Sequence, residues 1–229
     1  MPTETPVEIS AVAVRDLGLK KAVNPPGTPA HAAIAYGMMA GERFYFSGMI
    51  GWDPATGKIP ESPAAQVQLA LDRVKAILAA AGLDFRHVVF VNPYLTRRLP
   101  MNVMNQVYAK HFEFGNTPAR ATIAVNHLPH DGNIEFTGVA VKDLSKRLAV
   151  RPKNMSPSAT ASPCVWADDT LYCSAKSGFL TGVNGGIYAD NVEDQVRMSM
   201  RNLLDGLEEA GINFSHVVAS NVYVDNLDE

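Results

Sequence analysis

The chain has 229 residues, of which 47% are apolar, 19% charged and 8% aromatic, and its formal net charge is −3. This composition is that of a globular protein with a sizeable core, and the acidic balance argues against a strong nucleic-acid binder, which more often shows a basic excess. No apolar run approaches the roughly 20 residues that cross a bilayer, and residues 1–10 lack the basic start and apolar core of a signal peptide. We therefore expect a cytoplasmic protein without membrane contact. Its two cysteines are expected to be reduced, with neither a disulfide framework nor a metal cluster.

The chain up to residue 150 reads as alternating strands and helices. Residues 34–48, "IAYGMMAGERFYFSG", predict a hairpin that turns at Gly41-Glu42. After a loop rich in Pro and Gly, residues 62–81 predict a helix with Ser62 as its cap, Pro63 at its first position and Gly82 as its stop. The remaining segments are a strand, a shorter helix and two strands, at residues 87–95, 101–112, 119–125 and 134–141.

This β-β-α-β-α-β-β order predicts an α+β domain whose mixed sheet is covered by helices on one face. Apolar runs such as "HVVFV" predict that the other face is buried as well, against another copy of the domain. Val67, Leu71, Val74 and Leu78 recur at helical spacing, which indicates the side of the first helix that contacts the sheet.

The second half of the chain repeats the first. The segment "DRVKAILAAAGLDFRHVVFVNPYL" returns as "RNLLDGLEEAGINFSHVVASNVYV", and "FYFSGMIG" at Phe44 returns as "LYCSAKSG" at Leu171. The second copy therefore predicts a hairpin that turns at Asp168-Asp169, a helix capped by Asn191, and a strand ending at Val224. Cys164 and Cys173 then lie opposite each other across the hairpin. His87 and His216 fall at equivalent places after the helices and are interpreted as turn histidines, not as bases.

A third match joins the two ends of the repeat. "MPTETPVEISAVAVRDL" at the N-terminus matches "LPHDGNIEFTGVAVKDL" at Leu128, so Glu8 corresponds to Glu135. We therefore predict that residues 7–14 form a strand in the sheet of the second copy. The predicted domains are residues 1–23 (the last strand of the second copy), 24–150 (a complete copy) and 151–229 (an incomplete copy). Two copies joined in a ring with one segment removed, or a window of a longer tandem array, would both give this order.

The motifs of the first copy resemble the RidA/YjgF family, whose members are also called L-PSP-type endoribonucleases. The resemblance rests on Ser-Gly after the second strand, "DPATGKIP", the long helix, "TPAR" and "LPHDGNIEFTGVAV". It implies a chorismate mutase-like fold and trimers with ligand clefts between adjacent subunits. It further implies hydrolysis of reactive enamines and imines to 2-keto acids and ammonia, without a metal or an organic cofactor.

Six positions carry over from the family's pocket. The resemblance implies that Arg120 grips the substrate carboxylate and that Glu135 positions and polarises the attacking water. The side chains that it implies as the pocket lining are Ser47, Asn105, Thr122 and Tyr36. Thr122 stands where many members carry cysteine, and Tyr36 stands in "IAY" where the usual motif is Gly-Pro-Tyr.

The physical chemistry of arginine agrees with the role that the resemblance implies for Arg120. Arg120 shares a strand face with Thr122 and Ala124, which gives the small and polar surroundings of a pocket wall. Its planar guanidinium can bind a carboxylate through two parallel hydrogen bonds, which lysine cannot reproduce. The alternative is an ion pair between Arg120 and Glu135 that only stabilises the sheet. Ser47 as a strand-end residue and Asn105 as a solvated helix residue are further structural alternatives.

The sequence thus favours a RidA-like hydrolytic deaminase that acts on a small carboxylate-bearing substrate. We also expect a homo-oligomer, with the copies in a trimeric or pseudo-trimeric arrangement. One alternative is a non-catalytic small-molecule-binding or scaffold protein, which the second copy favours because Ala175 follows Ser174 where Gly48 follows Ser47. An L-PSP-type endoribonuclease is the other alternative, and the lack of a basic patch counts against it.

Overall fold

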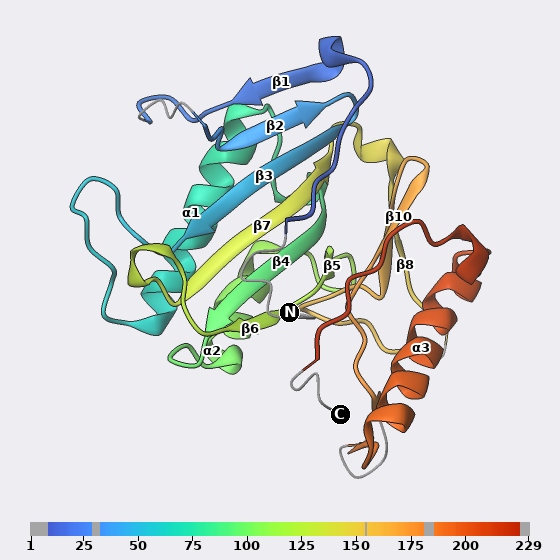
Figure 1. Cartoon of the computed structure of the whole chain (residues 1–229). Helices are drawn as coiled ribbons and strands as arrows, with labels where there is room; N and C mark the ends of the chain where they lie inside the picture. Colours follow the sequence, from blue (N-terminus) through green and yellow to red (C-terminus); the bar gives the residue numbers. More distant parts are fainter. Residues whose placement is uncertain (1–8, 29–32, 154, 181–185, 225–229) are drawn as a thin grey trace. The chain divides into compact units, whose positions relative to one another are not determined.

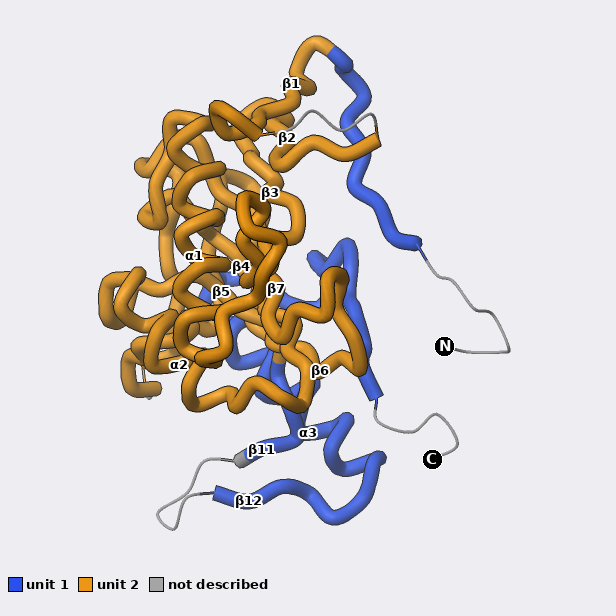
Figure 2. The backbone as a smooth tube through the Cα atoms, turned by 90° about the vertical axis from the view of Figure 1, so that its left-hand side faces the viewer, with its two compact units in different colours: residues 1–17, 176–229 blue, residues 18–175 orange. Residues whose placement is uncertain are grey.

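The computed structural model of the chain describes residues 9–28, 33–153, 155–180 and 186–224. The chain divides into two compact units, one of residues 18–175 and the other of residues 1–17 and 176–229 (Figure 2). Within the described residues, no helix is both long and apolar enough to span a bilayer.

The unit of residues 18–175 is built on a seven-stranded mixed sheet (Figure 1). Its strands are β1 (Lys20–Val23), β2 (Gly37–Ala40), β3 (Arg43–Ile50), β4 (Val88–Thr96), β5 (Ala119–Arg120), β6 (Ile123–Val125) and β7 (Ile134–Val141). They lie in the order β1-β2-β3-β7-β4-β5, with β6 also paired to β4. Strands β2 and β3 form the predicted hairpin, since Ala40 pairs with Arg43 and the left-handed Gly41 lies in the turn between them.

Two helices cover one face of this sheet, as the sequence predicts. They are α1 (Pro63–Ala80) and α2 (Met101–Tyr108). The predicted stripe on α1 is buried, together with the side chains Phe44, Phe46 and Phe136 of the sheet. Ser62 occupies the cap position of α1 but its side chain makes no capping hydrogen bond. The helix ends before Gly82, which adopts the left-handed φ of +74° that favours glycine.

The opposite face of the sheet is covered by a hairpin of the second copy. Strands β8 (Arg147–Val150), β9 (Cys164–Ala167) and β10 (Thr170–Cys173) form a separate three-stranded sheet in the order β10-β9-β8. Val165 and Ala167 of β9 are fully buried in one cluster with Val89, Val139 and Val141 of the large sheet. The second face is therefore buried against another copy, as predicted, and the β9–β10 turn falls at Asp168-Asp169. Cys164 and Cys173 stand opposite each other in the register of this hairpin, and their Sγ atoms lie 2.7 Å apart.

Strand pairing differs from the predicted domain boundaries at both ends of the first copy. Residues 20–23 belong to the predicted segment of the second copy, yet they form β1, which pairs with β2 of the first. Residues 147–150 belong to the predicted first copy, yet they form β8, which pairs with β9 of the second. Both strands stand at equivalent places in the repeat, because Arg147 follows Lys20 by 127 residues, as Glu135 follows Glu8. Each is thus the first strand of its copy by pairing.

The strand predicted at residues 7–14 is not formed over its described part. Residues 9–16 belong to no strand or helix, and Ile9 and Val12 are 85% and 75% exposed. Residues 7 and 8, including Glu8, lie outside the described residues. Apolar alternation alone was a wrong guide here because a strand also needs a paired neighbour.

The unit of residues 1–17 and 176–229 contains the long helix α3 (Val192–Glu209) and two short paired strands, β11 (Phe179–Leu180) and β12 (Ile187–Tyr188). Asn191 caps α3 as predicted, its side chain accepting a hydrogen bond from the N–H of Asp194 at 2.8 Å. Residues 217–224, in contrast, form no strand, and Val218 is 94% exposed. The prediction of a strand there was wrong for the same physical reason as at the N-terminus.

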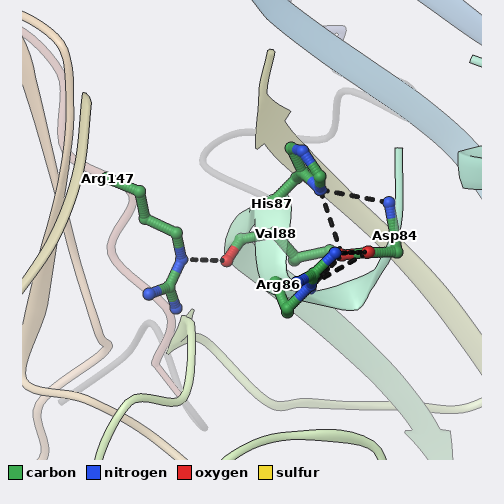
Figure 3. A network of polar contacts seen from close by, with 5 residues as sticks. All are labelled: Asp84, Arg86, His87, Val88 and Arg147. Atoms are coloured by element: carbon green, nitrogen blue, oxygen red, sulfur yellow. Dashed lines mark hydrogen bonds and ion pairs between the residues drawn. The ribbon is translucent and has the colours of Figure 1, made fainter. Parts of the chain in front are cut away.

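The turn before β4 explains the repeated histidine. Asp84 accepts hydrogen bonds from the backbone and side chain of Arg86, and Nδ1 of His87 lies 3.1 Å from the same carboxylate (Figure 3). These contacts, those of Arg86 foremost, lower the pKa of Asp84 to about 2. Asn213 and His216 form the equivalent turn in the second copy. The histidines are turn residues, as predicted, and Arg147 of β8 binds the adjacent carbonyl of Val88 at 3.0 Å.

Candidate functional site

Arg120 lies at the end of β5 and its side chain points toward α2. One guanidinium nitrogen donates a hydrogen bond of 2.7 Å to Oδ1 of Asn105, and Cζ lies 5.4 Å from the centre of the Tyr108 ring. Burial lowers the pKa of the guanidinium from its usual value. Within the described residues Arg120 has no carboxylate partner, so a buried cation is held by neutral groups only.

The backbone of Arg120 is held by the second copy. Its N–H donates to the hydroxyl of Ser174 at 2.8 Å, and its carbonyl accepts from the N–H of Ala175 at 3.0 Å. The same hydroxyl donates to the carbonyl of Ser162 at 2.6 Å, and Ser174 is only 6% exposed. The hairpin that covers the sheet therefore also fixes the position of the arginine.

Glu135 lies on β7 and points to the other face of the sheet. Ile134 and Phe136, its neighbours in sequence, are fully buried in the core on the helix side, so the strand alternation turns Glu135 away from the helices. It pairs with Ile50 of β3 and Tyr94 of β4. Burial raises the pKa of its carboxyl above the ordinary value, and no cation partner stands beside it within the described chain.

The carboxylate of Glu135 occupies the space beside a glycine. The register of β3 against β7 shifts between Phe46 and Met49, which leaves Ser47 and Gly48 in an irregular stretch of the strand. A Cβ atom built on Gly48 would overlap Oε1 of Glu135 and lie 2.7 Å from its Cδ. The missing side chain at this position thus makes room for the carboxylate.

Arg120 and Glu135 are not brought together within one copy. Arg120 pairs with Val91 of β4, a residue of the helix-side core, whereas Glu135 faces the opposite side. The ion pair considered as an alternative is not formed among the described residues. Each of the two charged groups is instead partly buried in a separate half-site.

The other four predicted pocket residues are placed separately. Asn105 binds Arg120, Tyr36 packs against the helix-side core, and the hydroxyl of Thr122 is buried without a hydrogen-bond partner among the described residues. Ser47 lies on β3, and Tyr36 lies just before β2. The hydroxyl of Ser47 donates a hydrogen bond to the carbonyl of Ala35 at 2.6 Å, and the backbone N–H of Ser47 donates to the carbonyl of Tyr36 at 2.8 Å.

The strand predicted at residues 119–125 is split into β5 and β6. Between them the carbonyl of Ala121 accepts a hydrogen bond of 3.1 Å from the side-chain amide of Asn92. A side chain thus takes the place of a ladder bond, and Thr122 falls outside both strands. The expected alternation of Arg120 with Thr122 along one continuous strand was therefore wrong.

Sequence reasoning missed Ser174 and Gly48 as residues that position the predicted groups. The repeat carried the signal, since "FSG" and "CSA" stand at equivalent places in the two copies. Ser47 and Ser174 make the same hydrogen bond, each to the carbonyl twelve residues earlier. Within the described residues, no group of three or more His, Cys, Asp or Glu side chains could hold a metal ion.

Comparison with known proteins identifies relatives of both copies. A sequence model of the family described as Endoribonuclease L-PSP matches residues 28–142 and 152–229. The 2-iminobutanoate/2-iminopropanoate deaminase of Rattus norvegicus is 33% identical over 126 residues, covering 54% of this chain and 91% of that protein. Protein DfrA of Myxococcus xanthus is 40% identical over 103 residues, covering 44% of this chain and 78% of that protein.

A solved structure agrees with these matches. The yeast protein described as YEO7_yeast is 27% identical, with a TM-score of 0.50, over 54% of this chain and 99% of that one. About half of the chain therefore has the fold of one complete relative, and the family model also matches most of the remainder. The chain belongs to the Endoribonuclease L-PSP family, which is the family that its RidA/YjgF-like motifs indicate.

Proposed function

We propose that the protein is a hydrolytic deaminase of small imino acids, the activity after which several of its relatives are named. The observation that carries this proposal is the buried guanidinium of Arg120, which Asn105 orients and which no carboxylate of the described chain neutralises. Such a group is suited to bind the carboxylate of a substrate through two charge-assisted hydrogen bonds.

The chemistry requires only a held substrate and an activated water. In the iminium form of the substrate, water adds to the carbon of the C=N bond, a C–O bond forms, and the C–N bond then breaks. The products are a 2-keto acid and ammonium, so that one water is consumed for each substrate. An ionised Glu135 would accept one proton from the attacking water and return it to the departing nitrogen, and the second proton would pass from the new hydroxyl to the released ammonia as the C=O bond forms.

Because Arg120 and Glu135 face opposite sides of one sheet, we place the reaction at a cleft between copies. There an arginine of one copy and a glutamate of another would contact the same substrate. The backbone contacts of Ser174 and Ala175 with Arg120 support this arrangement, since the second copy lies directly beside the arginine of the first.

The direct test is the decay of 2-iminobutanoate generated in solution, with and without the protein. We expect the full chain to accelerate formation of the 2-keto acid and ammonium, and Glu135→Gln to remove most of the acceleration. Binding of 2-oxobutanoate without any acceleration of imine decay would contradict the proposal.

That outcome would support the second candidate, a non-catalytic binder of small carboxylates. The observation that favours it is Ala175, which stands beside Arg120 at the place where the first copy has Gly48. A ribonuclease activity remains the third candidate, for which salt-sensitive RNA binding would be the first sign.

A further inference from the structure

Gly48 is a glycine of a strand and not of a turn. The glycines of the turns, such as Gly41 and Gly82, adopt left-handed backbone conformations that favour glycine. Gly48 does not, so its backbone could carry any residue. The close approach of Glu135 is therefore what requires a glycine at this position.

The nature of the overlap shows what a larger residue would do. The three atoms nearest to a Cβ on Gly48 all belong to the side chain of Glu135, namely Oε1, Cδ and Cγ. They are the end of a flexible side chain, which can rotate away at little cost. An added methyl group would thus displace the carboxylate and leave the strands in place. At Gly138, in contrast, a Cβ would meet the backbone oxygen of Phe90 and disturb the sheet itself.

We infer that Gly48 is a positioning residue for Glu135, because the absence of a side chain at residue 48 leaves a slot, the space that the carboxylate occupies. Ala175 follows Ser174 as Gly48 follows Ser47, and both serines make the same hydrogen bond. The second copy therefore repeats the serine contact and carries a methyl group at the position that corresponds to Gly48. This inference rests on the proposed function for its catalytic meaning, but not for its structural content.

The surroundings of Glu135 make its displacement measurable. The residues directly opposite it are the apolar Ile50 on β3 and the titratable Tyr94 on β4, and burial is the cause of its raised pKa. A carboxylate pushed out of the slot loses this burial, so its pKa should fall toward the ordinary value for glutamate.

The experiment is a carbon-13 NMR titration of the full chain labelled at the glutamate carboxyl groups. The Glu135 signal is assigned by its loss in Glu135→Gln. We expect a raised pKa in the wild type, a pKa near the ordinary value in Gly48→Ala, and the wild-type value in the mirror variant Ala175→Gly. An unchanged Glu135 pKa in folded Gly48→Ala would overturn the inference.

A double-mutant cycle keeps the inference testable if Gly48→Ala unfolds. Removing the carboxylate empties the slot, so Gly48→Ala should have no further effect on stability in a Glu135→Ala background. Loss of folding in the double variant, with Glu135→Ala itself folded, would show that Gly48 serves the backbone and would overturn the inference.

The imine assay separates this inference from the proposed function. If the protein is a deaminase, Gly48→Ala should lower kcat roughly 100-fold or more, as expected for loss of a general base, with a smaller effect on KM. If the wild type shows no deaminase activity while the pKa of Glu135 still falls in Gly48→Ala, the proposed function fails and the positioning role stands.

Discussion

The two charged residues of the candidate site differ in what they contribute to stability. Glu135 is a partly buried carboxyl whose pKa is raised by burial, so the folded protein retains its proton to a higher pH than the unfolded chain does. Between the ordinary and the raised pKa the folded state binds more protons, and stability falls as the pH rises through that window. At pH values above the raised pKa, the ionised carboxylate of Glu135 still lowers the stability of the folded state. A general base that activates water must be ionised, so catalysis would require this loss of stability.

We therefore predict that Glu135→Gln is more stable than the wild type at pH 7. The difference in melting temperature should shrink as the pH falls below about 4, where both proteins carry a neutral group. Thermal denaturation between pH 3 and 8 measures it. A lower melting temperature for Glu135→Gln at neutral pH would mean that the carboxylate has a stabilising cation partner.

Arg120 permits a test of carboxylate binding that does not depend on turnover. Lysine keeps the charge but loses the planar fork, and one lost charge-assisted hydrogen bond costs roughly 1.5 to 3 kcal/mol. We predict that Arg120→Lys weakens 2-oxobutanoate binding roughly 10- to 100-fold in calorimetry. The exposed Arg97→Lys is the matched control and should bind as the wild type does.

For single residues, the sequence predicted that Arg120 and Glu135 place charges on strands of the sheet. It did not predict which side chains contact each other. Asn105 and Arg120, which the family resemblance assigns to one pocket, share a hydrogen bond. The separation of Arg120 and Glu135 onto opposite faces depends on strand register, which no short pattern encodes. The role of Gly48 depends on a contact with β7, almost 90 positions later in the chain.

Among the elements, the β9–β10 hairpin has the widest influence on the candidate site. The hydroxyl of Ser174 makes two hydrogen bonds, accepting from the N–H of Arg120 and donating to the carbonyl of Ser162. Ser47, its counterpart in the first copy, donates to the carbonyl of Ala35. The two serines stand at equivalent positions of the repeat, but only Ser174 also accepts a hydrogen bond from the backbone of Arg120.

We predict that Ser174→Ala destabilises the chain more than Ser47→Ala does. The first change leaves a backbone N–H without its acceptor in a buried setting, which costs about 1–3 kcal/mol, whereas one ordinary hydrogen bond contributes about 1 kcal/mol. Denaturant unfolding of both variants measures the difference. Equal losses would mean that water replaces the hydroxyl of Ser174 beside Arg120.

Elements with a paired partner were predictable, and those without one were not. Helices α1 and α3 and both hairpins follow from periodicity, caps and turn residues. Residues 9–14 and 217–224 carry the same strand patterns as their counterparts in the first copy but form no strand. Strands β1 and β8 have only four residues each and were missed, because pairing with β2 and β9 defines them and periodicity does not.

For the whole molecule, the pairing of β1 with β2 and of β8 with β9 shows that the folding unit extends beyond the predicted residues 24–150. A chain cut to residues 24–150 keeps the large sheet but lacks β1 and the hairpin that covers Val89, Val139 and Val141. A chain cut to residues 18–175 keeps both sheets and both faces of the core. Exposed apolar sheet surfaces of this kind favour aggregation.

We accordingly predict that residues 18–175 alone form a monodisperse protein with cooperative thermal unfolding, whereas residues 24–150 aggregate or bind a hydrophobic dye. Size-exclusion chromatography and calorimetry of the two fragments compare them directly. A well-folded 24–150 fragment would show that the second copy is dispensable for the first.

The burial of Val165 and Ala167 against the first copy has a consequence for how the repeat tolerates change. A duplicated copy is often expected to accumulate substitutions freely. Here the hairpin of the second copy packs in the interior of the first, so a saturation mutagenesis map should show two kinds of position in the second copy. Residues that face solvent would accept most replacements, and those against the first sheet would be as intolerant as any core residue of the half that they protect.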